Sequence, residues 1–182
     1  MNASSRGCRA GDDLFSAAQR GQVDRVKALL AAADTRNVTV QEEMLAALCI
    51  AIRNDFPGVV RILCTTGAHF GLAVQKYKIT FRYPLRLSVA ERGNFQPIHL
   101  AASTGSASCI DELVSRFQVS AGARDEDMDA PLHWACRYAH VDVVRQLLAV
   151  KASVLDENQQ GMTPPHLANL YNHNRIVAAL DV

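Results

Sequence analysis

The sequence predicts an all-α solenoid of about five stacked helix-turn-helix units, with a β-hairpin inserted between the second and third units. Three observations lead to this prediction. Three similar segments recur along the chain, at residues 96–102, 130–136 and 163–169, and they read QPIHLAA, APLHWAC and TPPHLAN. Apolar residues follow each segment at the same offsets, and one connection between units is much longer than its counterpart. A fixed period of this kind is typical of repeat proteins, whose units are stable as a stack.

The histidines of these segments, His99, His133 and His166, recur at an almost constant spacing along the chain. Six residues after each histidine stands a turn residue, and eleven and fourteen residues after it stand apolar residues: Gly105, Ile110 and Leu113; Ala139, Val144 and Leu147; Asn172, Val177 and Leu180. The same offsets, counted from Phe15 and Cys49, recover two degenerate units upstream. We therefore expect one domain over residues 1–182, with units at about 10–40, 41–69, 91–123, 124–156 and 157–182.

Each unit is expected to contain two antiparallel helices. In the clearest unit, Val143, Val144 and Leu147 have the 3.6-residue spacing of a buried helical stripe. Thr163 is expected to cap a helix that begins with proline. Gln96 and Ala130 replace this threonine in the two preceding units, and the loss of such a cap typically costs ~1 kcal/mol.

The repeated segment resembles the ankyrin repeat in both its T-P-L-H-x-A signature and the length of its period. The resemblance covers nearly the whole chain outside the insertion. It implies a non-catalytic protein that binds its partners through the concave face of the stack. It also implies that the recurring histidines form hydrogen bonds within and between units. Because successive histidines lie one unit apart and no C-x-x-C or H-x-x-x-H spacing accompanies them, we expect no metal site.

Composition excludes several functional classes. Lys and Arg number 19 against 18 Asp and Glu, so no overall charge favours nucleic acid or an anionic membrane. No apolar run approaches the ~20 residues that span a bilayer, and residues 1–13 lack the apolar core of a secretory signal. Five cysteines without a close pair predict free thiols and a cytoplasmic location, with the nucleus as a second possibility. No catalytic or phosphate-binding motif is present, so we expect neither enzyme activity nor a cofactor.

The connection between the second and third units is the main anomaly. The interval from Gly67 to His99 is about twice the matching interval from Lys151 to His166, so an insertion is expected at about 70–90. Apolar and polar residues alternate on both sides of a Pro-containing break, which favours a β-hairpin. A decayed helix of another unit and a disordered loop are the alternatives. In each case the segment is basic.

Binding positions are carried over from the resemblance, as the loop tips and the exposed ends of the first helices. For a protein partner they are Arg53, Asn54, Phe95, Asp127, Asp129, Arg137, Tyr138, Met162, Leu170 and Tyr171, together with Lys78, Arg82 and Arg86 of the insertion. Aromatic side chains and Arg are enriched where binding energy concentrates, so the exposed rings are expected to act as anchors. The loop before the fourth unit is acidic and the insertion is basic, which steers a partner or clamps the insertion onto its neighbour.

The sequence thus predicts a protein-interaction adaptor or scaffold that binds a protein through its concave face and basic insertion. We expect neither nucleic acid nor a membrane as a partner. The alternative is a structural subunit whose basic insertion contacts nucleic acid or another acidic polymer. Salt dependence separates the two, because phosphate contacts weaken steeply with salt.

Overall fold

The computed structural model describes residues 10–67 and 95–180, which contain α-helices and no β-strand. The helices form five consecutive pairs, here units 1 to 5: α1 (Ala10–Gln19) with α2 (Val23–Ala32), α3 (Val38–Arg53) with α4 (Pro57–Thr65), α6 (Pro97–Thr104) with α7 (Ala107–Ser115), α8 (Pro131–Arg137) with α9 (Val141–Ala149), and α10 (Pro164–Leu170) with α11 (Asn174–Leu180). The all-α repeat fold predicted from the period is confirmed. The predicted β-hairpin at 70–90 lies outside the described residues.

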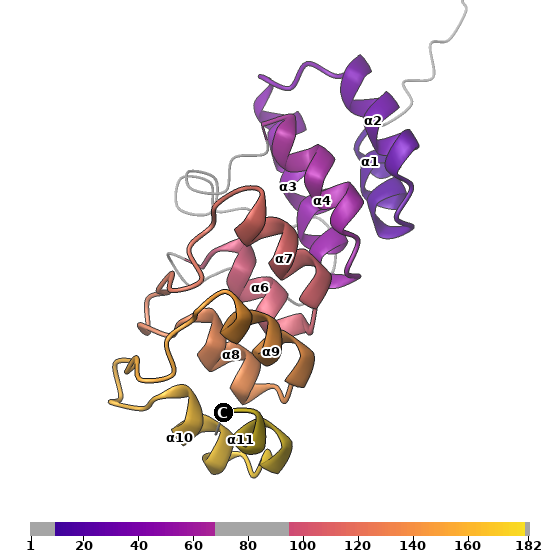
Figure 1. Cartoon of the computed structure of the whole chain (residues 1–182). Helices are drawn as coiled ribbons and strands as arrows, with labels where there is room; N and C mark the ends of the chain where they lie inside the picture. Colours follow the sequence, from indigo (N-terminus) through magenta and orange to yellow (C-terminus); the bar gives the residue numbers. More distant parts are fainter. Residues whose placement is uncertain (1–9, 68–94, 181–182) are drawn as a thin grey trace, which may run out of the picture.

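The five units stack in one direction, so their helices form two layers (Figure 1). First helices pack against one another in the order α1, α3, α6, α8 and α10, and second helices pack in the order α2, α4, α7, α9 and α11. Each unit therefore covers apolar faces of its neighbours, and stability is shared along the stack.

Small and branched apolar side chains fill the space between the helices. Ala101, Ala135 and Ala168 are completely buried at the same position of three first helices, where their size lets neighbouring helices approach closely. Ile110 and Val144 are completely buried at the matching position of two second helices. Full burial of a Val or Ile side chain contributes about 1.5–3 kcal/mol, so the predicted offsets mark the main source of stability.

The turn inside each unit has a left-handed backbone conformation. The residues are those that the repeat offsets predict, namely Gly21, Asp55, Gly105, Ala139 and Asn172, and their φ angles lie between +55° and +83°. Gly105 has a second reason to be glycine. An added Cβ there would lie 2.8 Å from Nδ1 of His140, which belongs to the next unit.

Units 2 and 3 contact each other directly, although the segment that connects them, residues 68–94, lies outside the described part of the chain. The Ser106 hydroxyl donates to the Ile52 carbonyl at 2.6 Å. The Arg61 guanidinium makes two hydrogen bonds to the Glu112 carboxylate, at 2.8 and 2.9 Å, and these bonds hold the pKa of Glu112 below its usual range. Units 2 and 3 are therefore held together by hydrogen bonds between residues of their own helices and turns.

The histidine of each T-P-L-H-like segment caps its own helix. The backbone N–H groups of Gln96, Ala130 and Thr163 donate to Nδ1 of the histidine three residues later, at 3.0, 3.1 and 3.2 Å. This bond does not depend on the side chain that precedes the proline. The helices that begin after Gln96 and Ala130 therefore keep a cap hydrogen bond without the threonine.

Candidate protein-binding surface

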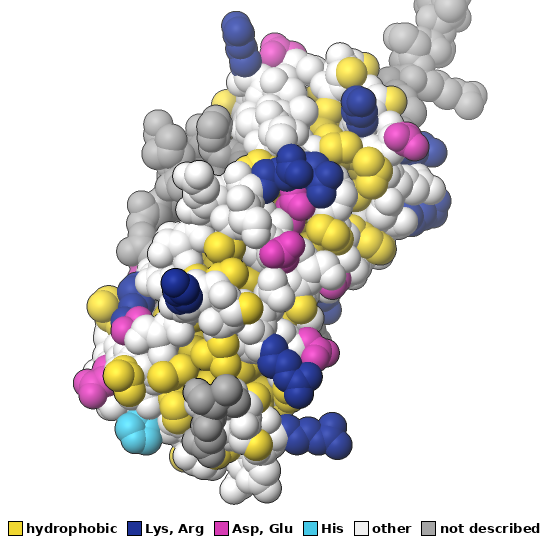
Figure 2. Space-filling view, viewed as in Figure 1, with side chains coloured by type: hydrophobic (Ala, Val, Ile, Leu, Met, Phe, Trp, Pro, Cys, Tyr) yellow, Lys and Arg dark blue, Asp and Glu magenta, His cyan; other side chains and the backbone are white. Residues whose placement is uncertain are grey.

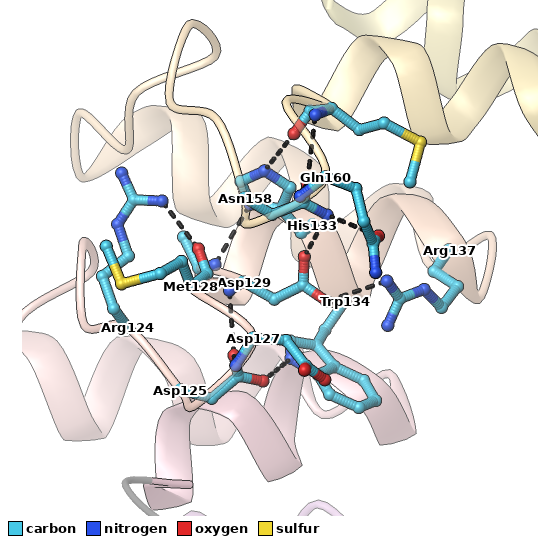
Figure 3. Close-up of polar contacts among 12 residues, drawn as sticks. Arg124, Asp125, Asp127, Met128, Asp129, His133, Trp134, Arg137, Asn158 and Gln160 are labelled. Atoms are coloured by element: carbon cyan, nitrogen blue, oxygen red, sulfur yellow. Dashed lines mark hydrogen bonds and ion pairs between the residues drawn. The ribbon is translucent and has the colours of Figure 1, made fainter.

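A buried carboxylate organises the loop before α8, residues 116–130, here the α8 loop. Asp125 is 2% exposed. Its Oδ1 accepts the backbone N–H groups of Asp127 and Asp129, at 3.0 and 2.8 Å, and its Oδ2 accepts the indole N–H of Trp134 at 2.9 Å (Figure 3). A carboxylate that accepts three N–H groups closes the loop on itself and fixes it to the first turn of α8.

Asp129 connects the α8 loop to the loop before α10, residues 150–163, here the α10 loop. Its carboxylate accepts from Arg137 and from the Asn158 amide, both at 2.8 Å. The prediction that Asp129 is an acidic residue available to a partner is wrong. The side chain is 1% exposed because these two bonds hold it inside the stack.

The prediction that Phe95 is an exposed anchor is also wrong. Phe95 is 9% exposed and lies edge-on to Trp134, with ring centroids 5.5 Å apart. Trp134 itself is 2% exposed, as expected for a core residue. Phe95 therefore fills the interface between units 3 and 4, where an aromatic pair contributes beyond its buried area.

Two recurring histidines form the hydrogen bonds between units that the resemblance implies. Nε2 of His99 lies 3.1 Å from the Ala123 carbonyl, and Nε2 of His133 lies 3.1 Å from the Met162 carbonyl. Since Nδ1 of each ring accepts a backbone N–H, the proton must be on Nε2, which donates to the carbonyl of the next loop. Both rings are therefore neutral in the folded stack.

We expect the stack to lose stability as the pH falls below about 6.5. Burial lowers the pKa of His99 and of His133 from the usual 6.5, and a nearby carboxylate, that of Asp125 for His99 and that of Asp129 for His133, offsets this only in part. Below pH 6.5 the unfolded chain binds protons that the folded chain does not, so the free energy of unfolding falls by up to about 1.4 kcal/mol per histidine per pH unit. Urea denaturation between pH 7.5 and 5.5 measures this slope.

A His133→Gln variant is the control for this slope. It should show about half the pH dependence of the natural chain over the same range, because one of the two buried imidazoles is gone. An NMR titration in which both imidazoles of the folded chain protonate near pH 6.5 would contradict the prediction.

Three predicted anchors are exposed at the ends of first helices. Tyr138 is 48% exposed, Leu170 is 60% exposed and Tyr171 is 47% exposed. The Tyr138 ring stacks on Trp134 at 5.9 Å, and the Tyr171 ring stacks on His173 at 6.0 Å. Each tyrosine is thus held in place before any partner arrives, which reduces the entropy lost on binding.

The other predicted positions are divided between surface and interior. Arg53 and Asn54 are exposed, and the Asn54 amide donates to the Gln19 carbonyl of unit 1 at 3.1 Å.

Three further predicted positions, Asp127, Arg137 and Met162, are half-buried. The Arg137 guanidinium lies 5.1 Å from the centre of the Trp134 ring, so Asp129 and this ring together hold it. Lys78, Arg82 and Arg86 lie outside the described residues.

Near the predicted anchors, sequence reasoning missed the exposed apolar residues Met128 and Leu155, which are 46% and 81% exposed. They lie in the α8 loop and the α10 loop. One signal in the sequence could have identified Met128. It stands five residues before His133, and the residue at the same distance before His166 is a glycine, Gly161.

The described cysteines have raised pKa values, and the described residues contain no cluster of metal ligands. Burial raises the pKa of the Cys49, Cys64 and Cys136 thiols to about 12 and also raises that of Cys109, so these thiols stay protonated at neutral pH. Over residues 10–67 and 95–180, no group of three His, Cys, Asp or Glu side chains could hold a metal ion. In the same ranges, no helix has the length and apolar character to cross a bilayer.

The family assignment follows from comparison with known proteins. A family model described as ankyrin repeats, in three copies, matches residues 70–155 and 98–180. The chain belongs to the ankyrin-repeat family. The matched region includes units 3 to 5, whose T-P-L-H-like segments and histidine hydrogen bonds are described above.

Several relatives of this chain are much longer than the region that matches. The transient receptor potential cation channel subfamily A member 1 homolog of Caenorhabditis elegans is 33% identical over 86 residues, and its human counterpart is 32% identical over 87 residues. Each match covers 46% of this chain, but 7% and 8% of the relatives. Mouse ankyrin repeat and SOCS box protein 11 is 34% identical over 86 residues, which are 47% of this chain and 26% of that protein. The chain thus spans about a quarter or less of these relatives.

Proposed function

We propose that this ankyrin-repeat chain is a non-catalytic adaptor or scaffold that binds a protein partner through the concave face of its first helices and its basic insertion. Ankyrin repeats generally support protein-interaction roles. One observation carries the proposal for this chain. Seven large apolar side chains are exposed in the described residues, and five of them lie in units 4 and 5 or in the loops before them. Such clustering marks interaction sites.

The rings and charges of this region support a protein as the partner. Tyr138 and Tyr171 are exposed aromatic side chains on fixed supports, which is the residue type and geometry of binding hot spots. The four described cysteines are free thiols, which supports a reducing compartment such as the cytoplasm or nucleus as the place of action.

Loss of either proposed contact should weaken binding to a partner isolated by affinity purification and identified by mass spectrometry. A Tyr138→Ala/Tyr171→Ala variant should bind at least about 30-fold more weakly, because hot-spot side chains contribute about 2 kcal/mol or more.

Reversing the charges of Lys78, Arg82 and Arg86 to Glu should also weaken binding of the partner. The loss should be greatest at low salt, because salt screens the attraction between the insertion and the partner. Isothermal titration calorimetry at two salt concentrations measures both effects.

Val23→Ala is the matched control, because Val23 is an exposed apolar residue at the start of α2 in unit 1. It should leave the affinity unchanged. Unchanged binding by the folded double-tyrosine variant would remove the concave face from the proposal, and unchanged binding by the charge-reversed variant would remove the insertion. Steeply salt-dependent binding to RNA or DNA would instead favour the structural subunit that contacts an acidic polymer.

A further inference from the structure

Met128 occupies a turn position where this chain elsewhere has glycine. Met128 and Gly161 each precede the histidine of their unit by five residues. Both have left-handed backbones, with φ of +60° for Met128 and +72° for Gly161. An L side chain adopts this conformation less readily than glycine, because its Cβ crowds the following carbonyl oxygen. Among the described residues with positive φ, Met128 is the one with a long apolar side chain.

The fold holds the Met128 backbone in this conformation but makes little use of its side chain. The Met128 N–H donates to the Asp125 carbonyl at 3.1 Å, and Nη1 of Arg124 donates to the Met128 carbonyl at 2.8 Å. The side chain is 46% exposed, and it extends beside Arg124, away from the Trp134 ring (Figure 3). Residues kept in an unfavourable conformation without a packing reason concentrate at functional sites.

One arginine, Arg124, bonds to Met128 and to the two residues that follow Leu155 in the chain. Nη2 of Arg124 pairs with Asp156 at 2.7 Å, next to Leu155, and Nη1 also donates to the Glu157 carbonyl at 3.1 Å. Leu155 is the most exposed of the large apolar side chains described, at 81%. Both loops are therefore fixed while they present apolar side chains to solvent. We call Met128 and Leu155, with the exposed Glu126 and Glu157, the loop patch.

The charge around the loop patch is negative. Residues 124–129 and 153–161 contain six carboxylates and one cation, Arg124. Asp125 and Asp129 are buried and bonded within the stack, which leaves Glu126, Asp127, Asp156 and Glu157 with solvent exposure. Hydrophobic and acidic side chains lie side by side at the lower left of Figure 2, where these loops project in Figure 1. A complementary partner carries apolar side chains beside positive charge.

We propose that the loop patch binds a segment of a protein partner in which an apolar side chain lies next to Lys or Arg. This inference rests on the proposed function and names the chemistry of the partner at one site. The apolar side chain contacts Met128 and Leu155, and the cation lies against Glu126 and Glu157. In this arrangement the Met128 side chain contributes to binding but lowers the stability of the turn, where the backbone conformation favours glycine.

A peptide selection on the full chain tests the proposal. A random peptide library displayed on phage is enriched on the natural chain, and the selected peptides are synthesised and measured by fluorescence polarisation. The enriched peptides should carry an apolar residue next to Lys or Arg.

Met128→Gly should weaken the binding of these peptides at least about tenfold. The same variant should raise the melting temperature by about 2 °C, because glycine relieves the strain of the left-handed turn. Glu126→Gln/Glu157→Gln should weaken binding most at low salt.

Val38→Ser is the matched control, since Val38 is 48% exposed at the start of α3, far along the stack from the α8 loop. It should leave peptide affinity unchanged. A Met128→Gly variant that melts earlier would show that the side chain serves the fold, and this would overturn the inference. Peptides that bind Met128→Gly normally but not Tyr138→Ala/Tyr171→Ala would also overturn it, while leaving the proposed function intact. A selection without any binder would count against both, and a dimer of the natural chain that Met128→Gly abolishes would reassign the patch to a second copy.

Discussion

Replacing Asp125 by alanine should destabilise the stack by about 3–4 kcal/mol, the largest effect that we expect from a single substitution. The carboxylate accepts the N–H groups of Asp127, Asp129 and the Trp134 indole, and it is almost completely buried. Its removal leaves three donors without their acceptor in or near the interior. Urea denaturation followed by circular dichroism measures the loss.

Two further variants separate the indole bond from the backbone bonds. Asp125→Asn keeps an oxygen for the backbone N–H groups but turns an amide N–H toward the indole N–H, so its stability should be intermediate. Trp134→Phe removes the indole N–H that faces this amide. The Asp125→Asn/Trp134→Phe variant should therefore lose less stability than the sum of the two single variants. Glu126→Ala, at the exposed neighbouring position, is the control and should leave stability essentially unchanged. A loss below about 1 kcal/mol for Asp125→Ala would show that water replaces the carboxylate in this network.

Replacing His133 by alanine should destabilise the stack by about 2–4 kcal/mol. The ring is completely buried and bonds two units, since it accepts the Ala130 N–H and donates to the Met162 carbonyl. Without it, both backbone groups lose their partner and a cavity opens between α8 and the α10 loop. The free energy of unfolding from urea melts at pH 7.5, where the ring is neutral, measures the effect.

His166→Ala provides a control within the same motif. His166 also accepts a backbone N–H, from Thr163, but it is exposed and lies in unit 5, the last unit described. Its replacement should therefore destabilise by about 1 kcal/mol or less. Equal losses for His133→Ala and His166→Ala would mean that the bond to the next unit contributes nothing, and that the histidine acts only as a helix cap.

The candidate binding surface was predicted only in part. Tyr138, Leu170 and Tyr171 are predicted as exposed because their offset from the histidine places them at the end of a first helix, and a helix end is set by local sequence. Phe95 and Asp129 are predicted as exposed loop-tip residues from their offset before the histidine, but both are buried. Their burial depends on Trp134 and Asn158, which reach them from a neighbouring unit, and a repeat offset carries no information about such neighbours.

The sequence alone determined the period, the two helices of each unit, the position of the turn between them and the apolar positions of the second helices. These features are local and recur, so each unit supports the same prediction in the others. Only the tertiary structure decided which polar residues face inward and which apolar residues face outward. Asp125 is buried where three N–H groups converge on it, and Met128 and Leu155 are exposed on loops that Arg124 joins. Such arrangements arise from contacts between loops of different units, each with its own residues, and so no periodic pattern predicts them.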